Sequence, residues 1–301
     1  MAGPGEETRL IGYGLAVGAA LFWAISVVLF KRSSERIDAL SLNVLKTSLG
    51  FGLLLLTGAC FGFTDVARDP RVWLALAASG ALGIGLADTL MFKGLAQIGA
   101  SRQAIVDALY SPSVVLFSWW LLDERLSGRS LLGGTLILGA VGLASVFPGA
   151  DLPIERARLV RGTLLSASAV VLMAVAIILV KPMIERYGLL WCTAVRIAGG
   201  LVAMGGRALA QPSARARVAA VFRPQPSHKL TIPAAICGGY LSFVMWVGAF
   251  KFAPAGNAAL LNQTSSVFTV LLAVFVLGEP MTWRLALALL LACVGSLIVL
   301  L

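Results

Sequence analysis

Long apolar stretches follow one another along almost the whole chain, and none of them contains more than two charged residues. Because an α-helix rises about 1.5 Å per residue, about 20 apolar residues span the ~30 Å hydrocarbon core of a bilayer. The stretches are apolar on nearly every side, whereas strands of a membrane β-barrel alternate apolar and polar residues. With 59% hydrophobic and 13% charged residues, the chain differs from soluble globular domains. We predict an all-α polytopic membrane protein with ten transmembrane helices, near residues 10–30, 38–60, 72–97, 101–122, 130–148, 161–182, 188–209, 231–252, 257–278 and 283–301.

The two halves of the chain are related by an internal repeat. The matched pairs are Gly12 and Gly162, Lys31 and Lys181, Lys46 and Arg196, and Gly50 and Gly200 at a shift of 150 residues, then Gly83 and Gly238, and Glu124 and Glu279 at a shift of 155. Each half holds five predicted spans, an odd number, so the second half must enter the membrane from the opposite side. We therefore expect two inverted five-helix repeats around a central cavity, at residues 1–148 and 161–301, joined by a linker at 149–160.

One predicted span, within residues 100–124, carries polar side chains that lipid accommodates poorly. Gln103, Asp107 and Tyr110 recur at i, i+4 and i+7, so they share one face of the helix, and that face must look into protein or a water-filled cavity. Residues 255–279 repeat the pattern, with Asn262 in the place of Asp107. Two polar helices in register predict a site between them.

Asp107 is the main candidate for substrate contact or ion coupling, with Asn262 as its neutral counterpart. Protonation of Asp107 could exchange a proton for substrate by favouring one access state. Burial and neighbouring cations act on its proton affinity in opposite directions, and the sequence leaves that balance open. A structural Asp107 that caps or tethers the start of the span fits equally well. The full set of candidate cavity residues is Asp107, Asn262, Asp88, Gln103, Tyr110, Ser111, Trp23, Ser266, Gln263 and Trp246.

Three further charges fall inside predicted spans, and each has two interpretations. Lys46 and Arg196 either snorkel or tether neighbouring helices, or they contact substrate or a counter-ion. Asp88 either pairs with Lys46 or Lys93 or titrates in the cavity.

The acidic residues Glu124 and Glu279 end the two polar stretches, near the membrane interface. A carboxylate there can accept hydrogen bonds from backbone N–H groups in the first turn of the next span. We therefore expect a structural role for both.

Pro112 interrupts the first polar stretch and should kink it, because proline removes one backbone hydrogen bond. The aligned residue is Val267, so the second stretch need not kink in the same place. The third span is rich in small residues, and we expect it and its counterpart, with Gly238 and Gly239, to pack closely on neighbouring helices.

The sequence argues against several other kinds of site. Its four cysteines lie inside predicted spans without metal-ligand spacing, and we interpret them as buried apolar residues. His228, the only histidine, lies in a basic loop, so we expect no metal site, no cofactor and no histidine-based membrane enzyme. No glycine-rich loop of a nucleotide-driven pump is present. The net charge of +10 comes mostly from loops beside spans, which indicates contact with lipid headgroups rather than nucleic acid.

The segments WLLDERLSGRSLLGGTLILGAVGLASV and FVLGEPMTWRLALALLLACVGSLIVL resemble the closing part of the EamA domain, the five-helix repeat of the drug/metabolite transporter superfamily. Further points of similarity are the glutamate after spans four and nine, Pro112 twelve residues before Glu124, the basic residue in the second span of each half, and FAPAGNAALLNQ. Val267 departs from the usual proline of the second copy.

This resemblance implies ten helices around a central cavity and transport, often export, of small metabolites such as amino acids. The expected partners are a small-molecule substrate, membrane lipids and, as a candidate coupling ion, protons; the oligomeric state stays open. The alternative within the superfamily is a flippase of a lipid-linked substrate, which a lateral opening between helices would favour, whereas an enclosed cavity favours the transporter.

Two arguments conflict on topology in the expected bacterial-type inner membrane. The resemblance implies cytoplasmic termini, but 14 of the 24 lysines and arginines would then lie in the loops on the opposite side. The positive-inside rule favours the reverse orientation. We retain cytoplasmic termini as the expectation.

Overall fold

The computed structural model describes residues 5–33, 37–145, 155–277 and 283–300. The described elements are α1 (Glu6–Ser33), α2 (Ala39–Phe61), α3 (Pro70–Gly80), η1 (Ala81–Ala87), α4 (Asp88–Asp107), α5 (Tyr110–Leu122), α6 (Gly128–Ser145), α7 (Arg156–Ile178), α8 (Lys181–Arg186), α9 (Leu189–Ala210), α10 (Pro212–Val221), α11 (His228–Ala235), η2 (Ile236–Leu241), α12 (Ser242–Phe252), α13 (Ala255–Asn262), α14 (Thr264–Leu277) and α15 (Trp283–Leu300). All are α-helices except η1 and η2, which are π-helices.

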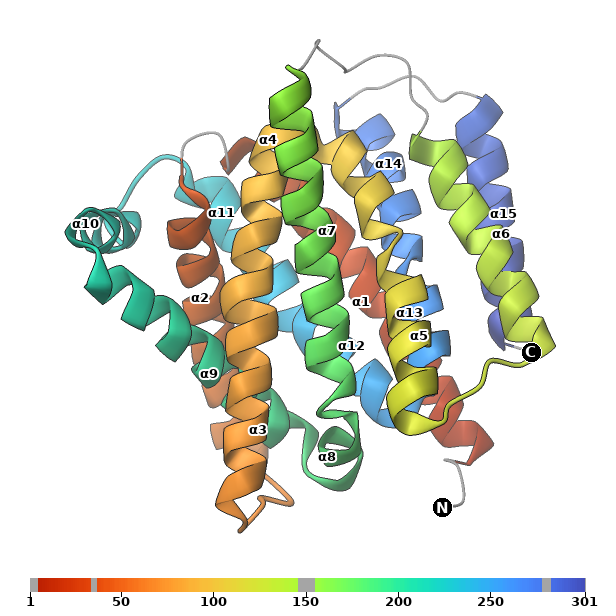
Figure 1. The fold of residues 1–301 in the computed structure, drawn as a ribbon, viewed down its shortest axis with the longest axis horizontal. Coiled ribbons are helices and arrows are strands. Elements are labelled where there is room, and N and C mark those ends of the chain that lie inside the picture. Colours follow the sequence, from red (N-terminus) through yellow and green to blue (C-terminus); the bar gives the residue numbers. More distant parts are fainter. Residues whose placement is uncertain (1–4, 34–36, 146–154, 278–282, 301) are drawn as a thin grey trace.

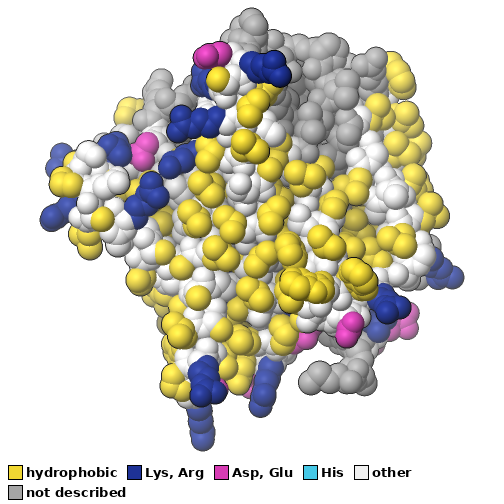
Figure 2. All heavy atoms as spheres, viewed as in Figure 1, with side chains coloured by type: hydrophobic (Ala, Val, Ile, Leu, Met, Phe, Trp, Pro, Cys, Tyr) yellow, Lys and Arg dark blue, Asp and Glu magenta, His cyan; other side chains and the backbone are white. Residues whose placement is uncertain are grey.

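The helices pack into one bundle, in which α1 begins in the lower half of Figure 1 and rises, whereas α7 begins at the top and descends. Hydrophobic side chains cover the middle of the face shown in Figure 2, and lysines and arginines gather towards its two ends. This distribution is the one expected of a protein surrounded by lipid.

Six helical segments in the described part of the chain are long and apolar enough to cross a membrane: Glu6–Phe30, Ala39–Phe61, Pro70–Ile98, Arg156–Ile178, Leu189–Ala210 and His228–Phe252. They confirm a helical protein with several membrane spans. Two of the other predicted spans are broken helices, and the remaining two correspond to α6 and α15. The number of ten spans therefore stays a prediction.

The two halves share their irregularities. The π-helix η1 begins at Ala81 and η2 begins at Ile236, a shift of 155 residues. Helix α4 gives way to α5 at Ala108 and Leu109, and α13 gives way to α14 at Gln263, at the same shift. Each half therefore departs from regular α-helix at equivalent positions.

Both polar stretches are interrupted at equivalent positions, although only the first contains a proline, Pro112. Pro112 lies in the first turn of α5, and the break at Ala108 is four residues earlier, where the proline ring would clash with the carbonyl group of a continuous helix. The second stretch breaks at Gln263 although Val267 is no proline. There, the side chain of Ser111 donates to the Ala259 carbonyl at 2.9 Å, so a neighbouring helix satisfies a backbone group beside the break.

Small residues let the helices of the two halves approach closely, as predicted for the third span and its counterpart. A Cβ atom on Gly80 of α3 would lie only 1.7 Å from the Arg196 carbonyl oxygen of α9, and one on Gly239 of η2 would lie 2.6 Å from the Lys46 carbonyl oxygen of α2. Only glycine permits both contacts. The backbones that carry the two intramembrane cations are thus held by the opposite half of the chain.

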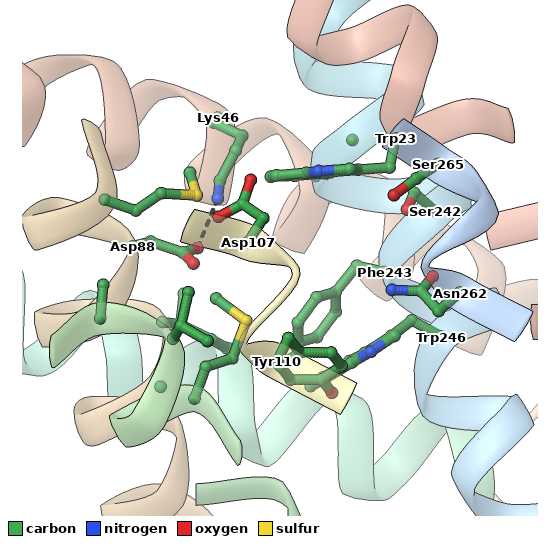
Figure 3. Close-up of a pocket in the computed structure, with 18 of the residues that line it drawn as sticks. Trp23, Lys46, Asp88, Asp107, Tyr110, Ser242, Phe243, Trp246, Asn262 and Ser265 are labelled. Carbon is green, nitrogen blue, oxygen red and sulfur yellow. Dashed lines mark hydrogen bonds and ion pairs between the residues drawn. The ribbon is translucent and has the colours of Figure 1, made fainter. Parts of the chain in front are cut away.

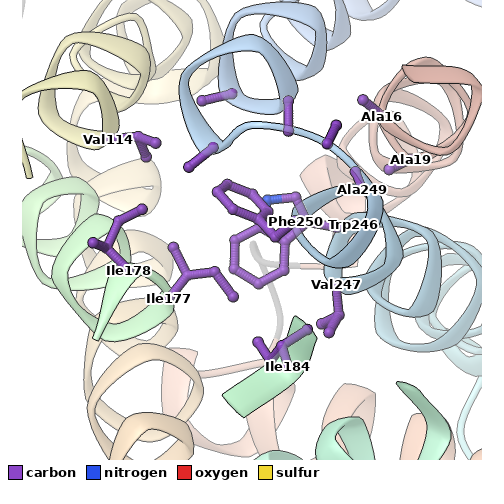
Figure 4. Close-up of a cluster of buried hydrophobic side chains, with 14 of the residues drawn as sticks. Ala16, Ala19, Val114, Ile177, Ile178, Ile184, Trp246, Val247, Ala249 and Phe250 are labelled. Atoms are coloured by element: carbon purple, nitrogen blue, oxygen red, sulfur yellow. The ribbon is translucent and has the colours of Figure 1, made fainter. Parts of the chain in front are cut away.

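An apolar cluster lies next to these contacts and packs α12 against α1, α5, α7 and α8. In Figure 4, Trp246 and Phe250 of α12 lie among aliphatic side chains, and their rings meet edge to face with centroids 5.3 Å apart. The cluster contains side chains from helices of both halves, and it positions Trp246.

Glu124 accepts a hydrogen bond from a helix N-terminus, as predicted, but not from the helix that follows it in sequence. Asp123 ends α5 in the left-handed conformation, with φ of 54°. The Glu124 carboxylate then accepts a hydrogen bond from the N–H of Ala255, the first residue of α13, at 2.7 Å, and pairs with Lys181 at 3.0 Å. The expected partner in the next span was therefore wrong, because this turn directs the side chain towards the other half. Glu279 lies outside the described residues.

The cysteines differ from one another in burial. Cys192 is buried and Cys237 is half-buried, but Cys60 and Cys293 are exposed on the surface of the bundle. The prediction of four buried cysteines was wrong for these two, because their helix faces point away from other helices, a distinction that an apolar stretch does not reveal.

Candidate functional site

A cavity of about 120 Å³ lies between the two halves, where the broken helices meet. Its lining comes from α1, α2, η1 and α4, from α5 and α7, and from α9, η2, α12, α13 and α14. Helices of both halves therefore contribute to its walls. Figure 3 shows the rings of Tyr110, Phe243 and Trp246 gathered on one side and an ion pair on the other.

Seven of the ten predicted site residues line this cavity: Trp23, Asp88, Asp107, Tyr110, Trp246, Asn262 and Gln263. Gln103 and Ser266 line a smaller adjoining cavity, which also borders Asp107 and Trp23. Ser111 lines neither cavity: it is fully buried and bonded to the backbone of α13.

Asp107 is the last residue of α4 and lies directly before the first helix break. Its Oδ1 accepts a hydrogen bond from Gln103 Nε2 at 2.7 Å, and Gln103 Oε1 in turn accepts one from Ser166 at 2.6 Å. Its own carbonyl accepts a hydrogen bond from Gln263 Nε2 at 2.8 Å, which joins the two broken helices. Within the described part of the chain Asp107 has no cationic partner at ion-pair distance. Its carboxylate therefore faces the cavity with only neutral hydrogen-bond partners.

Asp88 forms the buried ion pair that was one of its two predicted roles. Its Oδ2 lies 2.5 Å from Lys46 Nζ, and the side chains of both residues are at least nine-tenths buried. Lys46 Nζ also lies 5.4 Å from the centre of the Phe92 ring and 5.9 Å from that of Trp23. Lys93 is not the partner. Burial of a pair is tolerable only when each charge has its counter-charge, and this pair meets that condition.

Arg196 lines the same cavity and is 1% exposed. Its Nε donates to Ser79 Oγ at 3.2 Å, and its guanidinium lies 5.8 Å from the ring centre of Phe243 and 5.4 Å from that of Trp246. Ser79 donates to the Ala176 carbonyl at 2.5 Å, which holds the serine in place. Arg196 therefore belongs to the cavity and does not snorkel to the interface.

The candidate list omitted several residues that line the cavity, namely Lys46, Arg196, Thr47, Met91, Ser242, Phe243 and Ser265. The repeat held a usable signal for five of them. Lys46 and Arg196 are equivalent to each other, and the counterparts of the candidates Asp88, Tyr110 and Trp246 are Phe243, Ser265 and Met91, so each is implicated once its equivalent residue is placed in the cavity. Thr47 and Ser242 carried no such signal, because their counterparts, Ile197 and Ala87, are apolar.

Comparison with known proteins finds a family model that matches both halves of the chain. The model of the EamA-like transporter family matches residues 10–146 and again residues 160–301. The chain is 30% identical over 135 residues to an uncharacterized transporter, YoaV, of Bacillus subtilis, and 28% identical over 136 residues to an uncharacterized transporter of Methanothermobacter thermautotrophicus. These matches cover 44% and 45% of this chain, and 46% and 39% of the relatives' own lengths.

One solved crystal structure of a protein aligns with 97% of this chain and 96% of its own, with a TM-score of 0.74 and 20% sequence identity. At that identity the likeness concerns the fold. Because the family model matches twice and covers most of the residues, the chain belongs to the EamA-like transporter family.

Proposed function

We propose that the protein is a secondary transporter that moves a small polar or amphipathic metabolite, such as an amino acid or a related compound, by alternating access. The observation that carries this proposal is the cavity at the crossing of two broken helices, one from each half, with Asp107 on its wall. Broken helices expose backbone groups and polar side chains deep in a membrane protein, and they form the substrate sites of many transporters.

The proposed architecture is ten crossings in two inverted repeats, residues 1–148 and 161–301, joined by a linker at 149–160. The equivalent π-helices and helix breaks support a duplication, and the opposite directions of α1 and α7 in Figure 1 support its inversion. We propose an inner membrane of bacterial type, cytoplasmic termini and export. Alkaline phosphatase activity from a C-terminal fusion would contradict this orientation.

The flippase alternative receives less support. A groove between α4 and α7 is lined by Leu90, Arg156, Val160 and Leu164, among others, and it is open to the surface. It shares no lining residue with the central cavity. A lipid-linked substrate would need a continuous path between the two, so the separation of the groove from the central cavity favours a small free solute.

Asp107 is the proposed coupling residue, with Gln103 positioning its carboxylate. Since no cation of the described residues pairs with it, Asp107 can gain or lose a proton without breaking an ion pair among them, and protonation can then favour one access state. Asp88 is a weaker candidate for this role, because its proton would compete with Lys46 at 2.5 Å.

The test is uptake into proteoliposomes of a metabolite first identified by thermal shift of the purified protein. Asp107→Asn should preserve folding and substrate exchange but abolish uphill transport driven by a pH gradient. The double variant Asp107→Asn with Asn262→Asp moves the carboxylate to the equivalent position, and we expect it to restore part of the coupling. Asp65→Asn, in the loop before α3, is the matched control. Unchanged pH-dependent accumulation by Asp107→Asn would eliminate Asp107 and direct attention to Asp88.

A further inference from the structure

Two buried cations occupy equivalent positions of the repeat and line one cavity, but among the described residues only one of them has a counter-charge. Lys46 and Arg196 are related by the shift of 150 residues. Lys46 pairs with Asp88, whereas the residue equivalent to Asp88 in the second half is Phe243. The second half thus keeps the cation and replaces its acidic partner with an aromatic ring.

The guanidinium of Arg196 is left with an unused donor. Its Nη1 is buried and has no hydrogen-bond partner among the described residues, and no carboxylate of those residues lies within ion-pair distance. The buried Tyr110 hydroxyl faces the Trp246 ring on the same cavity and also lacks a partner with hydrogen-bond geometry. Buried donors are nearly always satisfied, so two unsatisfied donors on one cavity indicate a ligand that accepts from them.

We infer that Arg196 and Tyr110 form an anion subsite that binds a carboxylate or a comparable oxyanion of the transported molecule. This inference rests on the proposed function and names the chemical class of its substrate: a small organic anion or zwitterion with an apolar body. The planar guanidinium matches a carboxylate or phosphate group through paired N–H donors. Phe243 and Trp246, at 5.8 and 5.4 Å from the guanidinium, provide apolar walls for the rest of the molecule.

Binding to the purified full-length protein in detergent tests the subsite with three probes of similar shape: phenylacetate, phenylphosphonate and the uncharged phenylacetamide. A hydrogen-bonded charge should make at least one anion bind about 10- to 100-fold more tightly than the amide. The two anions distinguish a carboxylate site from a phosphate site. Equal affinities for all three probes, or no binding of either anion, would overturn the inference.

Arg196→Gln should remove the preference for anions, but loss of a buried arginine can also impair folding. Phe243→Asp avoids this difficulty, because it supplies the missing acidic partner and reproduces the arrangement around Lys46. We expect it to fold, to melt no lower than the wild type, and to lose the anion preference. Phe222→Asp makes the same change at an exposed position beyond the cavity, after α10, and should retain it. A folded Phe243→Asp that still prefers anions would refute the subsite.

The outcomes also separate this inference from the proposed function. Suppose that anions bind in a way that depends on Arg196, but that none of the bound anions is transported in proteoliposomes. This result would support the subsite and contradict the transporter proposal. Transport that is equally fast in the wild type and in Phe243→Asp would support the transporter and contradict the subsite.

Discussion

The two halves of the chain place a cation at the same position and surround it differently. In the first half, Lys46 and Asp88 form a closed pair at 2.5 Å. In the second half, Arg196 contacts two aromatic rings and one serine, and its Nη1 has no hydrogen-bond partner among the described residues. Equivalent positions of a repeated scaffold can thus carry the same charge in different surroundings.

The two halves also differ at the helix breaks, where the first half has an ionisable residue and the second half a neutral one. Asp107 in the first half has no cationic partner among the described residues, and its counterpart Asn262 is neutral. Both line the cavity. Within the described part of the chain, each half therefore contributes one ionisable group without a counter-charge, a carboxyl group from the first and a guanidinium from the second.

Among substitutions that test this difference between the halves, Asp88→Ala is expected to cause the largest loss of folding free energy. The change leaves the Lys46 ammonium buried without a counter-charge, and breaking a buried pair in this way costs about 3–5 kcal/mol of folding free energy. Thermal unfolding in detergent micelles, followed by size exclusion, measures the loss. The double variant Lys46→Met with Asp88→Leu removes both charges and should recover most of the stability. If Asp88→Ala melted like the wild type, the first pair would not be structural and the contrast between the halves would fail.

Glu124→Gln is expected to have the second largest effect. It weakens a charge-assisted hydrogen bond to the start of α13 and removes an ion pair with Lys181, together worth about 1–2 kcal/mol at this partly exposed site. The melting temperature should fall, and transport by the folded fraction should remain. We predict a similar result for Glu279→Gln, the equivalent residue. Abolished transport at unchanged stability, in either variant, would show that the halves do not share a structural glutamate.

Gln263→Ala makes the second break resemble the first, where Ala108 stands at the equivalent position. It leaves the Asp107 carbonyl without the donor that now lies 2.8 Å away, at a cost of about 1 kcal/mol. Unfolding in micelles should detect this loss. Gln263→Glu is an instructive companion, because the carboxylate keeps the length of the side chain but cannot donate when ionised. A neutral effect of both variants would indicate that the two breaks do not depend on each other.

Val267→Pro is expected to have the smallest effect. The helix is already interrupted at Gln263, so the new proline would fall in the first turn of α14, and we expect a loss below about 1 kcal/mol. Val270→Pro, one turn further into the helix, is the contrasting variant and should cost about 3 kcal/mol. Equal losses from the two prolines would mean that the break at Gln263 is not equivalent to the one before Pro112.

Much of this organisation could be predicted before any contact was known. The helical membrane class follows from the length and the apolar character of successive stretches. The family follows from the repeated glutamate and basic positions and from Pro112 in the first half. Seven of the ten candidate residues line the cavity. A polar side chain in a membrane helix faces the protein interior or a cavity, because contact with lipid costs free energy. Such patterns depend on neighbours along the chain, so the sequence alone can display them.

Tertiary structure decided which groups meet. The sequence by itself determined that Asp88, Lys46, Glu124 and Arg196 lie in or beside membrane helices. It left Lys46 and Lys93 as possible partners of Asp88, and the partner it predicted for Glu124 was in the wrong helix. The actual partners, Lys46 for Asp88 and the N–H of Ala255 for Glu124, lie 42 and 131 residues away along the chain. Contacts at such separation depend on how helices cross and on where glycines let them approach, and no local pattern records that geometry. For the same reason, only the folded chain reveals that Arg196 reaches the cavity and that no acidic residue of the described part of the chain pairs with it.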